Sequence, residues 1–219
     1  MAKGRPKMKK ERRKEKSTLD VENWKPITYI GKMVKSGEIT SLEQIADMGK
    51  PILEPEIIDA LFPVLEAETL QVKSTQRVTD SGKRTQFRAV VAIGDTKGHV
   101  GLGVGKSEEL KPAIDSAMKN AKKNMISIVT GCGSWECKCH VKHSIPQRTE
   151  GKEGSTVVML KPAPRGLGLA ANGTVRRVMS LAGIKDAWSF SHGGSNTYNV
   201  AVATIKALDN LNSLKPKAN

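Results

Sequence analysis

The order of hydrophobic and polar residues along the chain predicts helices first and strands afterwards. Within residues 37–69, apolar residues recur three or four positions apart and are interrupted by glycines and prolines, which favours several short helices, the last of them near 57–66. Apolar and polar residues then alternate over 70–79, 85–94 and 99–105, as the two faces of a strand require. The pattern therefore predicts three successive strands after a helical segment.

A tight turn joins the last two strands, and the third strand has an unusual glycine pattern. Residues 95–98 form the turn, in which Gly98 supplies the positive φ that closes such loops. Gly101, Gly103 and Gly105 share one face of the third strand. Because a face without side chains allows another group to approach the backbone closely, we expect either a helix or RNA to lie against it.

An amphipathic helix is predicted after the third strand. Pro112 is tolerated in its first turn, and its apolar residues follow one another at steps of three and four: Leu110, Ala113, Ile114, Ala117, Ala121 and Met125. With the preceding helix, the order becomes α-β-β-β-α. This order is similar to that of double-stranded-RNA-binding modules, which read duplex RNA by its shape, phosphates and 2′-hydroxyl groups.

The rest of the chain predicts a second α/β layer. A strand over 154–160 is followed by a helix that Gly183 ends, and a short strand around 187–191 and a final helix over 196–211 complete the layer. The fold class predicted for the whole chain is therefore α+β.

A glycine- and proline-rich loop at 161–169 leads into the first helix of this layer, which is capped near Asn172 or Thr174. Backbone N–H groups of such a loop, next to a helix N-terminus, form a phosphate-binding arrangement. Arg165 in the loop adds a guanidinium group suited to phosphate.

The net charge indicates what kind of partner the chain binds. Thirty-six Lys and Arg residues exceed 22 Asp and Glu residues, which leaves a formal charge of +14 and favours a polyanion such as nucleic acid. Aromatic residues make up 4% of the chain, which argues against base stacking and for contacts to phosphate, sugar and helix shape. The chain lacks the apolar run of about 18 residues that a membrane span needs, so we expect a cytosolic protein.

The charge is unevenly distributed. Residues 1–16 alone carry +7, and we expect this arm to be disordered by itself and ordered on RNA, with a solubilising tail as the alternative. Residues 37–69 contain eight acidic residues against Lys50. This stretch is either a face for basic neighbouring proteins or a solvated acidic surface.

Ten basic residues are predicted to neutralise and position phosphate groups. They belong to the loop between the first two strands and the strand after it, the sheet edge, the following helix and the second layer: Lys83, Arg84, Arg88, Lys97, Lys106, Lys122, Lys123, Arg165, Arg176 and Arg177. A basic hairpin tip that is merely solvated is the alternative for the first of these.

Two glycine-rich stretches invite nucleotide-binding interpretations that their residues do not support. Residues 101–107 end in Gly-Lys-Ser, but Val100 stands where a P-loop requires its first glycine. The loop at 161–169 resembles the phosphate loop of the galactokinase and homoserine kinase superfamily, but Leu169 and Ala170 replace its two serines. No nucleophile, base and orienting acid can be assembled from the four histidines, so the sequence does not support an enzyme.

The three cysteines and two of the four histidines gather in one short segment. Cys132, Cys137, Cys139 and His143 supply the three thiolates and one imidazole of a tetrahedral zinc site, and His140 is an alternative to His143. On a strand, Cys137 and Cys139 would lie about 6.6 Å apart along the chain, so a bulge would be needed to bring both to one metal. The alternative is a metal-free hairpin that links two domains.

Several stretches resemble the ribosomal S-five family. The first domain of that family is similar to residues 84–95, 98–106 and 113–124, and its second domain to residues 161–169 and 181–186. The pieces Cys-Gly-Ser-Trp-Glu-Cys and His-Ser-Ile-Pro resemble its archaeal members.

The resemblance implies a non-enzymatic constituent of the small ribosomal subunit. It implies a double-stranded-RNA-binding-like domain and a family-specific second domain, with this organisation: a basic arm at 1–20, an acidic helical extension at 21–66, the first domain at 67–130, a cysteine-rich hairpin at 131–150 and the second domain at 151–219. The implied partners are small-subunit rRNA, mRNA at its entry channel and neighbouring ribosomal proteins. The implied roles are in decoding accuracy and mRNA unwinding, and the alternative is a free-standing double-stranded-RNA-binding protein outside the ribosome.

Overall fold

The computed structural model describes residues 24–213 with the exception of positions 138 and 140, so the predicted basic arm lies outside the described residues. The chain divides after Leu65 into two compact units. None of the described helices is both long enough and apolar enough to cross a membrane.

The first unit contains three short helices. They are α2 (Tyr29–Ser36), α3 (Leu42–Asp47) and α4 (Glu56–Leu61), of which the last two lie in the stretch where short helices were predicted. The hydroxyl of Thr28 accepts a hydrogen bond from the first turn of α2, and Gly37 ends that helix in the left-handed conformation, at φ 84°. The helices enclose a small apolar core of Ile30, Ile39, Leu42, Ile45, Ile52, Ile57 and Ile58.

Glu54 ties the segment before α2 to the segment before α4. Its carboxylate accepts hydrogen bonds from the backbone N–H groups of Ile27 at 3.0 Å and Thr28 at 2.6 Å. Burial by itself raises the pKa of this carboxyl, but the hydrogen bonds from Thr28 and Ile27 outweigh it and hold the pKa below its ordinary value. Apolar contacts and charge-assisted hydrogen bonds such as those of Glu54 thus hold the described part of the first unit together.

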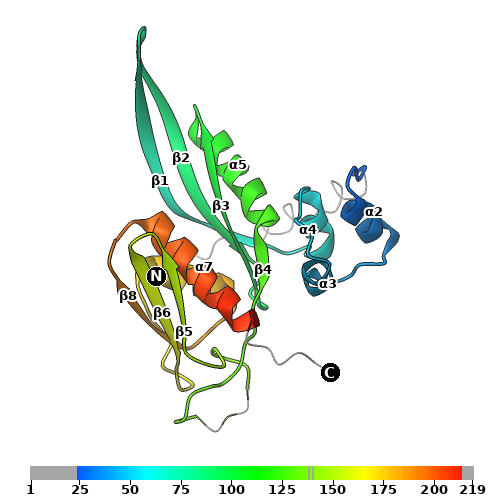
Figure 1. Cartoon of the computed structure of the whole chain (residues 1–219), viewed down its shortest axis with the longest axis vertical. Helices are drawn as coiled ribbons and strands as arrows, with labels where there is room; N and C mark the ends of the chain where they lie inside the picture. The colour runs from blue at the N-terminus through cyan, green and yellow to red at the C-terminus, as the bar shows by residue number, and fades with distance from the viewer. Residues whose placement is uncertain (1–23, 138, 140, 214–219) are drawn as a thin grey trace, which may run out of the picture. The chain divides into compact units, whose positions relative to one another are not determined.

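The second unit begins with an antiparallel sheet in the order β1-β2-β3-β4 (Figure 1). Its strands are β1 (Glu66–Thr79), β2 (Gly82–Gly94), β3 (His99–Ser107) and β4 (Met125–Ser127), and α5 (Leu110–Lys123) covers one face. The three predicted strands and the predicted helix are confirmed. Met125 was assigned to the helix and this is wrong, because the helix ends before it and its backbone pairs with Gly101 in β3.

The glycines of β3 lie directly under α5. An added methyl group at Gly103 would lie 2.1 Å from the carbonyl oxygen of Ala117 and 2.2 Å from the backbone nitrogen of Ala121. Gly101 and Gly105 meet the same helix in the same way. Of the two expected occupants of this glycine face, the structure shows the helix and not RNA.

A buried aspartate organises the turn between β2 and β3. Asp95 accepts hydrogen bonds from the backbone N–H groups of Lys97 at 2.8 Å and His99 at 3.0 Å, and its other oxygen lies 2.7 Å from His99 Nδ1. Gly98 has φ 116°, as the sequence predicted, and Thr96 has φ 60°. Burial raises the pKa of the Asp95 carboxyl, but the hydrogen bonds from His99 and Lys97 outweigh it, so the pKa lies below its ordinary value.

A second four-stranded sheet follows, in the order β5-β6-β8-β7, together with two helices. The elements are β5 (Thr149–Glu153), β6 (Thr156–Pro162), β7 (Leu169–Ala170), α6 (Gly173–Leu181), β8 (Ala187–His192) and α7 (Thr197–Ser213). The strand predicted at 154–160, the strand near 187–191 and both helices are confirmed, whereas β5 was not predicted.

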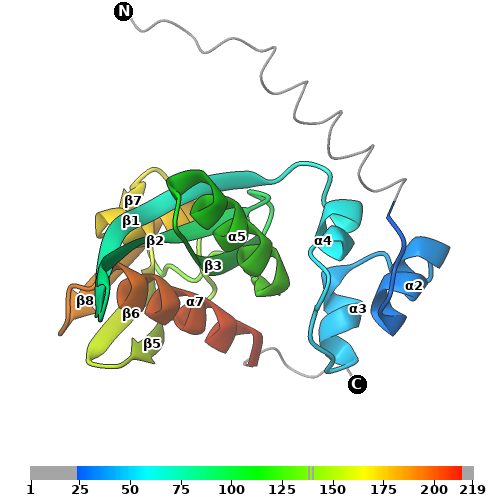
Figure 2. The ribbon, with the colours of Figure 1, turned by 90° about the horizontal axis from the view of Figure 1, so that it is seen from above.

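The two sheets share one hydrophobic core. The core includes Val90 and Leu102 from the first sheet, Val158 from the second sheet, and Met179 and Leu208 from the helices. Both α6 and α7 contact the first sheet, and α7 also packs on β5 and β6 (Figure 2). The helices therefore lie between the sheets, and the α+β fold class is confirmed.

Candidate nucleic-acid interface and cysteine cluster

A row of basic residues crosses the first sheet on the face opposite to α5. In the strand register, Arg77 pairs with Arg84, Lys73 pairs with Arg88, and Arg88 pairs with Lys106. Directly paired residues of an antiparallel sheet point to the same face, so these five residues form one surface, here called the basic band. The band follows the β1–β2 hairpin, which extends beyond the other strands (Figure 1).

The contacts of the basic band differ from its base to its tip. At the base, the guanidinium of Arg88 lies 4.9 Å from the centre of the Tyr198 ring on α7. Nearer the tip, Arg84 forms an exposed ion pair with Glu108. The hydrogen bond between the two side chains lowers the pKa of Glu108 and raises the pKa of Arg84. Lys73, Arg77 and Lys106 are exposed. Like charges that face each other directly across strands destabilise a sheet, and a bound polyanion removes that cost.

The structure changes two details of the predicted hairpin tip. Lys83 and Arg84 lie within β2 and not in the loop, because the turn consists of Asp80 and Ser81 alone. Lys73 and Arg77 were missed. A two-residue turn fixes the strand register, and building that register from the sequence would have placed Arg77 opposite Arg84.

A second basic surface surrounds a cavity of about 710 Å³ beside α6. Arg176 and Lys185 line it, and Lys97 adjoins Thr96 in its wall. Lys185 was not predicted. Arg177 is instead engaged elsewhere, since its Nε lies 3.3 Å from a carboxylate oxygen of Glu68 and so ties α6 to β1.

A third basic surface is a groove of about 500 Å³ between α5 and α7. Lys123 and Lys206 lie on its walls, and Asn120, Asn124 and Tyr198 supply further polar groups. Lys122, by contrast, is half-buried. The predicted basic residues are thus spread over several parts of the second unit, some of them outside these three surfaces, and are not gathered in one site.

The glycine-rich loop at 161–169 does not offer its amide groups to phosphate as predicted. The N–H groups of Gly166 and Gly168 donate to Asp186 Oδ1, at 3.1 and 2.8 Å. These two donors are therefore already occupied and are not available to a phosphate group. The exposed side chain of Arg165 is what the loop presents to solvent.

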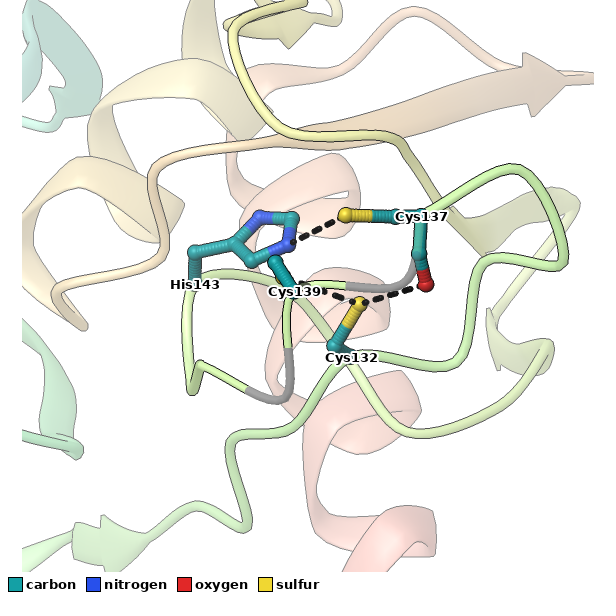
Figure 3. Close-up of side chains that lie close together, drawn as sticks. All are labelled: Cys132, Cys137, Cys139 and His143. Carbon is teal, nitrogen blue, oxygen red and sulfur yellow. Dashed lines mark hydrogen bonds between the residues drawn. The ribbon is translucent and has the colours of Figure 1, made fainter.

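The four predicted metal ligands do come together. One ligand atom from each of Cys132, Cys137, Cys139 and His143 lies within 4.8 Å of the others (Figure 3). The Sγ atoms of Cys132 and Cys139 are 3.6 Å apart, and Cys137 Sγ is 3.6 Å from His143 Nε2. The described residues between 132 and 139, all except position 138, belong to no strand, so the expected need for a β-bulge does not arise.

Two of the separations in this cluster match those around a bound zinc ion. In a tetrahedral site with Zn–S bonds of about 2.3 Å and Zn–N bonds of about 2.0 Å, two sulfurs lie about 3.8 Å apart, and sulfur and nitrogen about 3.5 Å apart. The two separations of 3.6 Å agree with these values. Three sulfurs and one imidazole are also the donor set of structural zinc sites.

The protonation of the thiols is tuned by their neighbours. Hydrogen bonds from Cys139 and from the backbone N–H of Arg165 lower the pKa of Cys137 to about 6, which favours its thiolate form. Burial, followed by the hydrogen bonds with Cys139 and Cys137, raises the pKa of Cys132 to about 11. Cys137 is thus the ligand most easily ionised, and binding of a cation would favour loss of the protons from the other thiols.

His143 is oriented by a residue distant in the sequence. Its Nδ1 lies 2.8 Å from Asp186 Oδ2, and both side chains are buried. A carboxylate at Nδ1 favours the tautomer with the proton there, and this leaves Nε2 free to bind a metal. Asp186 was missed, because no sequence spacing links it to the cysteines.

Comparison with known proteins agrees with this picture. Residues 65–129 match the model of the ribosomal protein S5 N-terminal domain, and residues 151–219 match that of the S5 C-terminal domain. The small ribosomal subunit protein uS5 of Methanococcus maripaludis is 50% identical over 208 residues, which cover 94% of this chain and 91% of the relative. Its counterpart in Methanocaldococcus jannaschii is 50% identical over 195 residues (89% and 90%), and that of Aeropyrum pernix 48% over 198 residues (90% and 91%).

A double-stranded-RNA-binding-like sheet whose projecting β1–β2 hairpin carries a basic band, packed on a second α/β layer, defines a structural RNA-binding protein. More particularly, the chain belongs to the uS5 family of small ribosomal subunit proteins. The resemblance found in the sequence and its archaeal character are confirmed. Membership of this non-enzymatic family also confirms that the chain is a structural component and not an enzyme.

Proposed function

We propose that the chain is a structural constituent of the small ribosomal subunit and that it binds rRNA through the basic band. The observation that carries this proposal is the register of β1, β2 and β3, which sets cations directly opposite cations. Such an arrangement lowers the stability of an isolated sheet and is favourable when phosphates lie between the charges. The cavity beside α6, with Arg176 and Lys185, extends the cationic surface on the same unit.

The finer features follow from the family resemblance. We further propose that the chain lies near the mRNA entry channel of the cytoplasmic ribosome, where its cationic surfaces contact incoming mRNA and support its unwinding and decoding accuracy. The acidic stretch at residues 37–69, in which Glu38, Glu43 and Asp47 are exposed, suits a basic neighbouring protein.

Sedimentation distinguishes this proposal from a free-standing RNA-binding protein. A tagged chain is expressed in a cell that contains its ribosomes, and the lysate is sedimented in moderate salt. We expect the chain to move with the small subunit and to remain there when the salt is raised moderately. A chain that leaves the particle and stays at the top of the gradient would support the free-standing module instead.

We also propose that Cys132, Cys137, Cys139 and His143 bind one structural zinc ion. The support is the fit of their separations to a tetrahedral site and the orientation of His143 by Asp186. The metal content of the purified full chain should approach one zinc per chain, and Cys137→Ser should abolish stoichiometric binding. Ser134→Ala, a change beside the ligands, is the control that should retain the metal. A chain without stoichiometric zinc would contradict this part of the proposal.

A further inference from the structure

Asp186 lies between the cysteine cluster and the loop that carries Arg165. One carboxylate oxygen faces His143 Nδ1 at 2.8 Å, and the other accepts the N–H groups of Gly166 and Gly168 at 3.1 and 2.8 Å. The residue is 5% exposed, so these contacts account for most of its surroundings. A single buried carboxylate therefore holds both a ligand of the cluster and two amides of the loop.

Further hydrogen bonds join the same two segments. The backbone N–H of Arg165 faces the sulfur of Cys137. The carbonyl oxygen of His143 accepts the N–H groups of Lys185 at 3.0 Å and Asp186 at 3.2 Å, and the hydroxyl of Ser144 accepts the N–H of Ala163 at 3.2 Å. Several backbone N–H groups of the loop thus bind protein atoms instead of solvent, and the loop conformation depends on the segment that contains the cysteine cluster.

The backbone conformation of the 164–168 loop depends on hydrogen bonds from outside the loop. Gly166 and Gly168 have φ values of 92° and 76°, and both N–H groups must turn toward one carboxylate oxygen. Left-handed glycine conformations are accessible but lose much chain entropy, so the hydrogen bonds to Asp186 are needed to fix them.

We propose that Asp186 couples zinc binding at the cysteine cluster to the conformation of the 164–168 loop, so that the metal positions Arg165 for RNA. This inference rests on the zinc site proposed above. A metal at Nε2 of His143 keeps the proton on Nδ1 and makes that N–H a stronger donor to Asp186. The carboxylate is then fixed in the orientation that accepts both glycine N–H groups. Without the metal, no coordination bond links His143 to the cysteines, so the ring and the carboxylate that it faces are fixed less firmly.

Coupling of this kind is reciprocal. If zinc orders the loop, then weakening the contact between Asp186 and the histidine must weaken zinc binding by an equivalent factor. Asp186→Asn is a specific change, because an amide retains one oxygen for the glycine N–H groups but turns an NH₂ group toward Nδ1. That group favours the tautomer with the proton on Nε2, which opposes the metal. We expect zinc affinity to fall about 10–100-fold, as is typical when such a partner is lost.

Asp95 supplies a matched control. It is also a buried aspartate that faces a histidine Nδ1 and accepts two backbone N–H groups, but its histidine, His99, is not part of the cysteine cluster. Asp95→Asn should therefore lower stability without a change in zinc affinity.

The test uses the full chain loaded with zinc. Zinc affinity is measured by competition with a chromophoric chelator, and amide hydrogen exchange is followed over residues 163–169. In the unaltered chain, removal of zinc should speed exchange at Gly166 and Gly168 at least tenfold. In Asp186→Asn, exchange should already be fast and should change little on zinc removal, whereas Asp95→Asn should behave like the unaltered chain.

The outcomes separate this inference from the zinc proposal. If zinc binds stoichiometrically but its removal leaves loop exchange unchanged, the coupling is refuted and the zinc site stands. If no zinc binds, both fail. Should Asp186→Asn not fold, zinc removal from the unaltered chain still decides the question, because it requires no variant.

Discussion

Gly103→Ala is expected to lower the free energy of unfolding of the second unit by about 3 kcal/mol, the upper part of the range for overpacking a core. The added methyl group would lie 2.1 Å from the carbonyl oxygen of Ala117 and 2.2 Å from the nitrogen of Ala121, both of which are backbone atoms of α5. No rotamer change relieves contacts with backbone, so α5 would have to move away from β3. Urea denaturation followed by circular dichroism measures the loss.

Gly173→Ala is the matched control for this prediction. Gly173 is the first residue of α6, its added methyl group would meet nothing within 4 Å, and its φ is not positive. Alanine should therefore be neutral or stabilising there, by less than about 1 kcal/mol. Equal stabilities of the two alanine variants would show that the packing of α5 on the β3 glycines is not as close as described.

The variant Lys73→Gln/Arg77→Gln/Arg84→Gln is expected to bind small-subunit rRNA about 100-fold more weakly near physiological salt, since each lost phosphate contact forfeits the release of about one counterion. The slope of log affinity against log salt should decrease in magnitude by about 2 to 3. Because the substitutions also remove the repulsion between Arg77 and Arg84, the free protein should be no less stable than the parent. Filter binding at several salt concentrations and thermal denaturation measure the two effects.

A control with the same loss of charge separates the basic band from net charge. Lys25, Lys32 and Lys152 are exposed lysines outside the band, so their joint replacement with glutamine also removes three positive charges. We expect this control to reduce affinity several-fold at most. Equal losses in the two triple variants would mean that the chain attracts RNA through its overall charge alone.

The sequence predicted the elements whose patterns are local. Alternation identified β1, β2 and β3, and the glycines of β3 indicated a close approach that proved to be that of α5. It missed β5 because Thr149–Glu153 is a polar stretch whose strand conformation depends on pairing with β6 and packing against α7. It also missed β4, whose three residues are too few for a periodic signal.

The sequence predicted which residue types form the cysteine cluster and the basic surfaces better than it predicted how those residues are arranged. Cys132, Cys137, Cys139 and His143 were recognised because they are close in the sequence, whereas Asp186 lies far from them and reaches His143 only through the fold. The basic band depends on strand register, which a list of basic residues does not contain. For the same reason the amides of Gly166 and Gly168 were expected to face phosphate, although they face Asp186.

Photo-crosslinking inside the assembled small subunit tests the central claim most directly, that the basic band on the β1–β2 hairpin binds RNA. Thr75 lies on β1 between Lys73 and Arg77 and is exposed, so a photoreactive phenylalanine derivative at this position samples what the basic band touches. Crosslinks to rRNA nucleotides, mapped by primer extension, are the predicted result. Crosslinks to proteins alone, from particles that contain the altered chain in full amount, would contradict the claim.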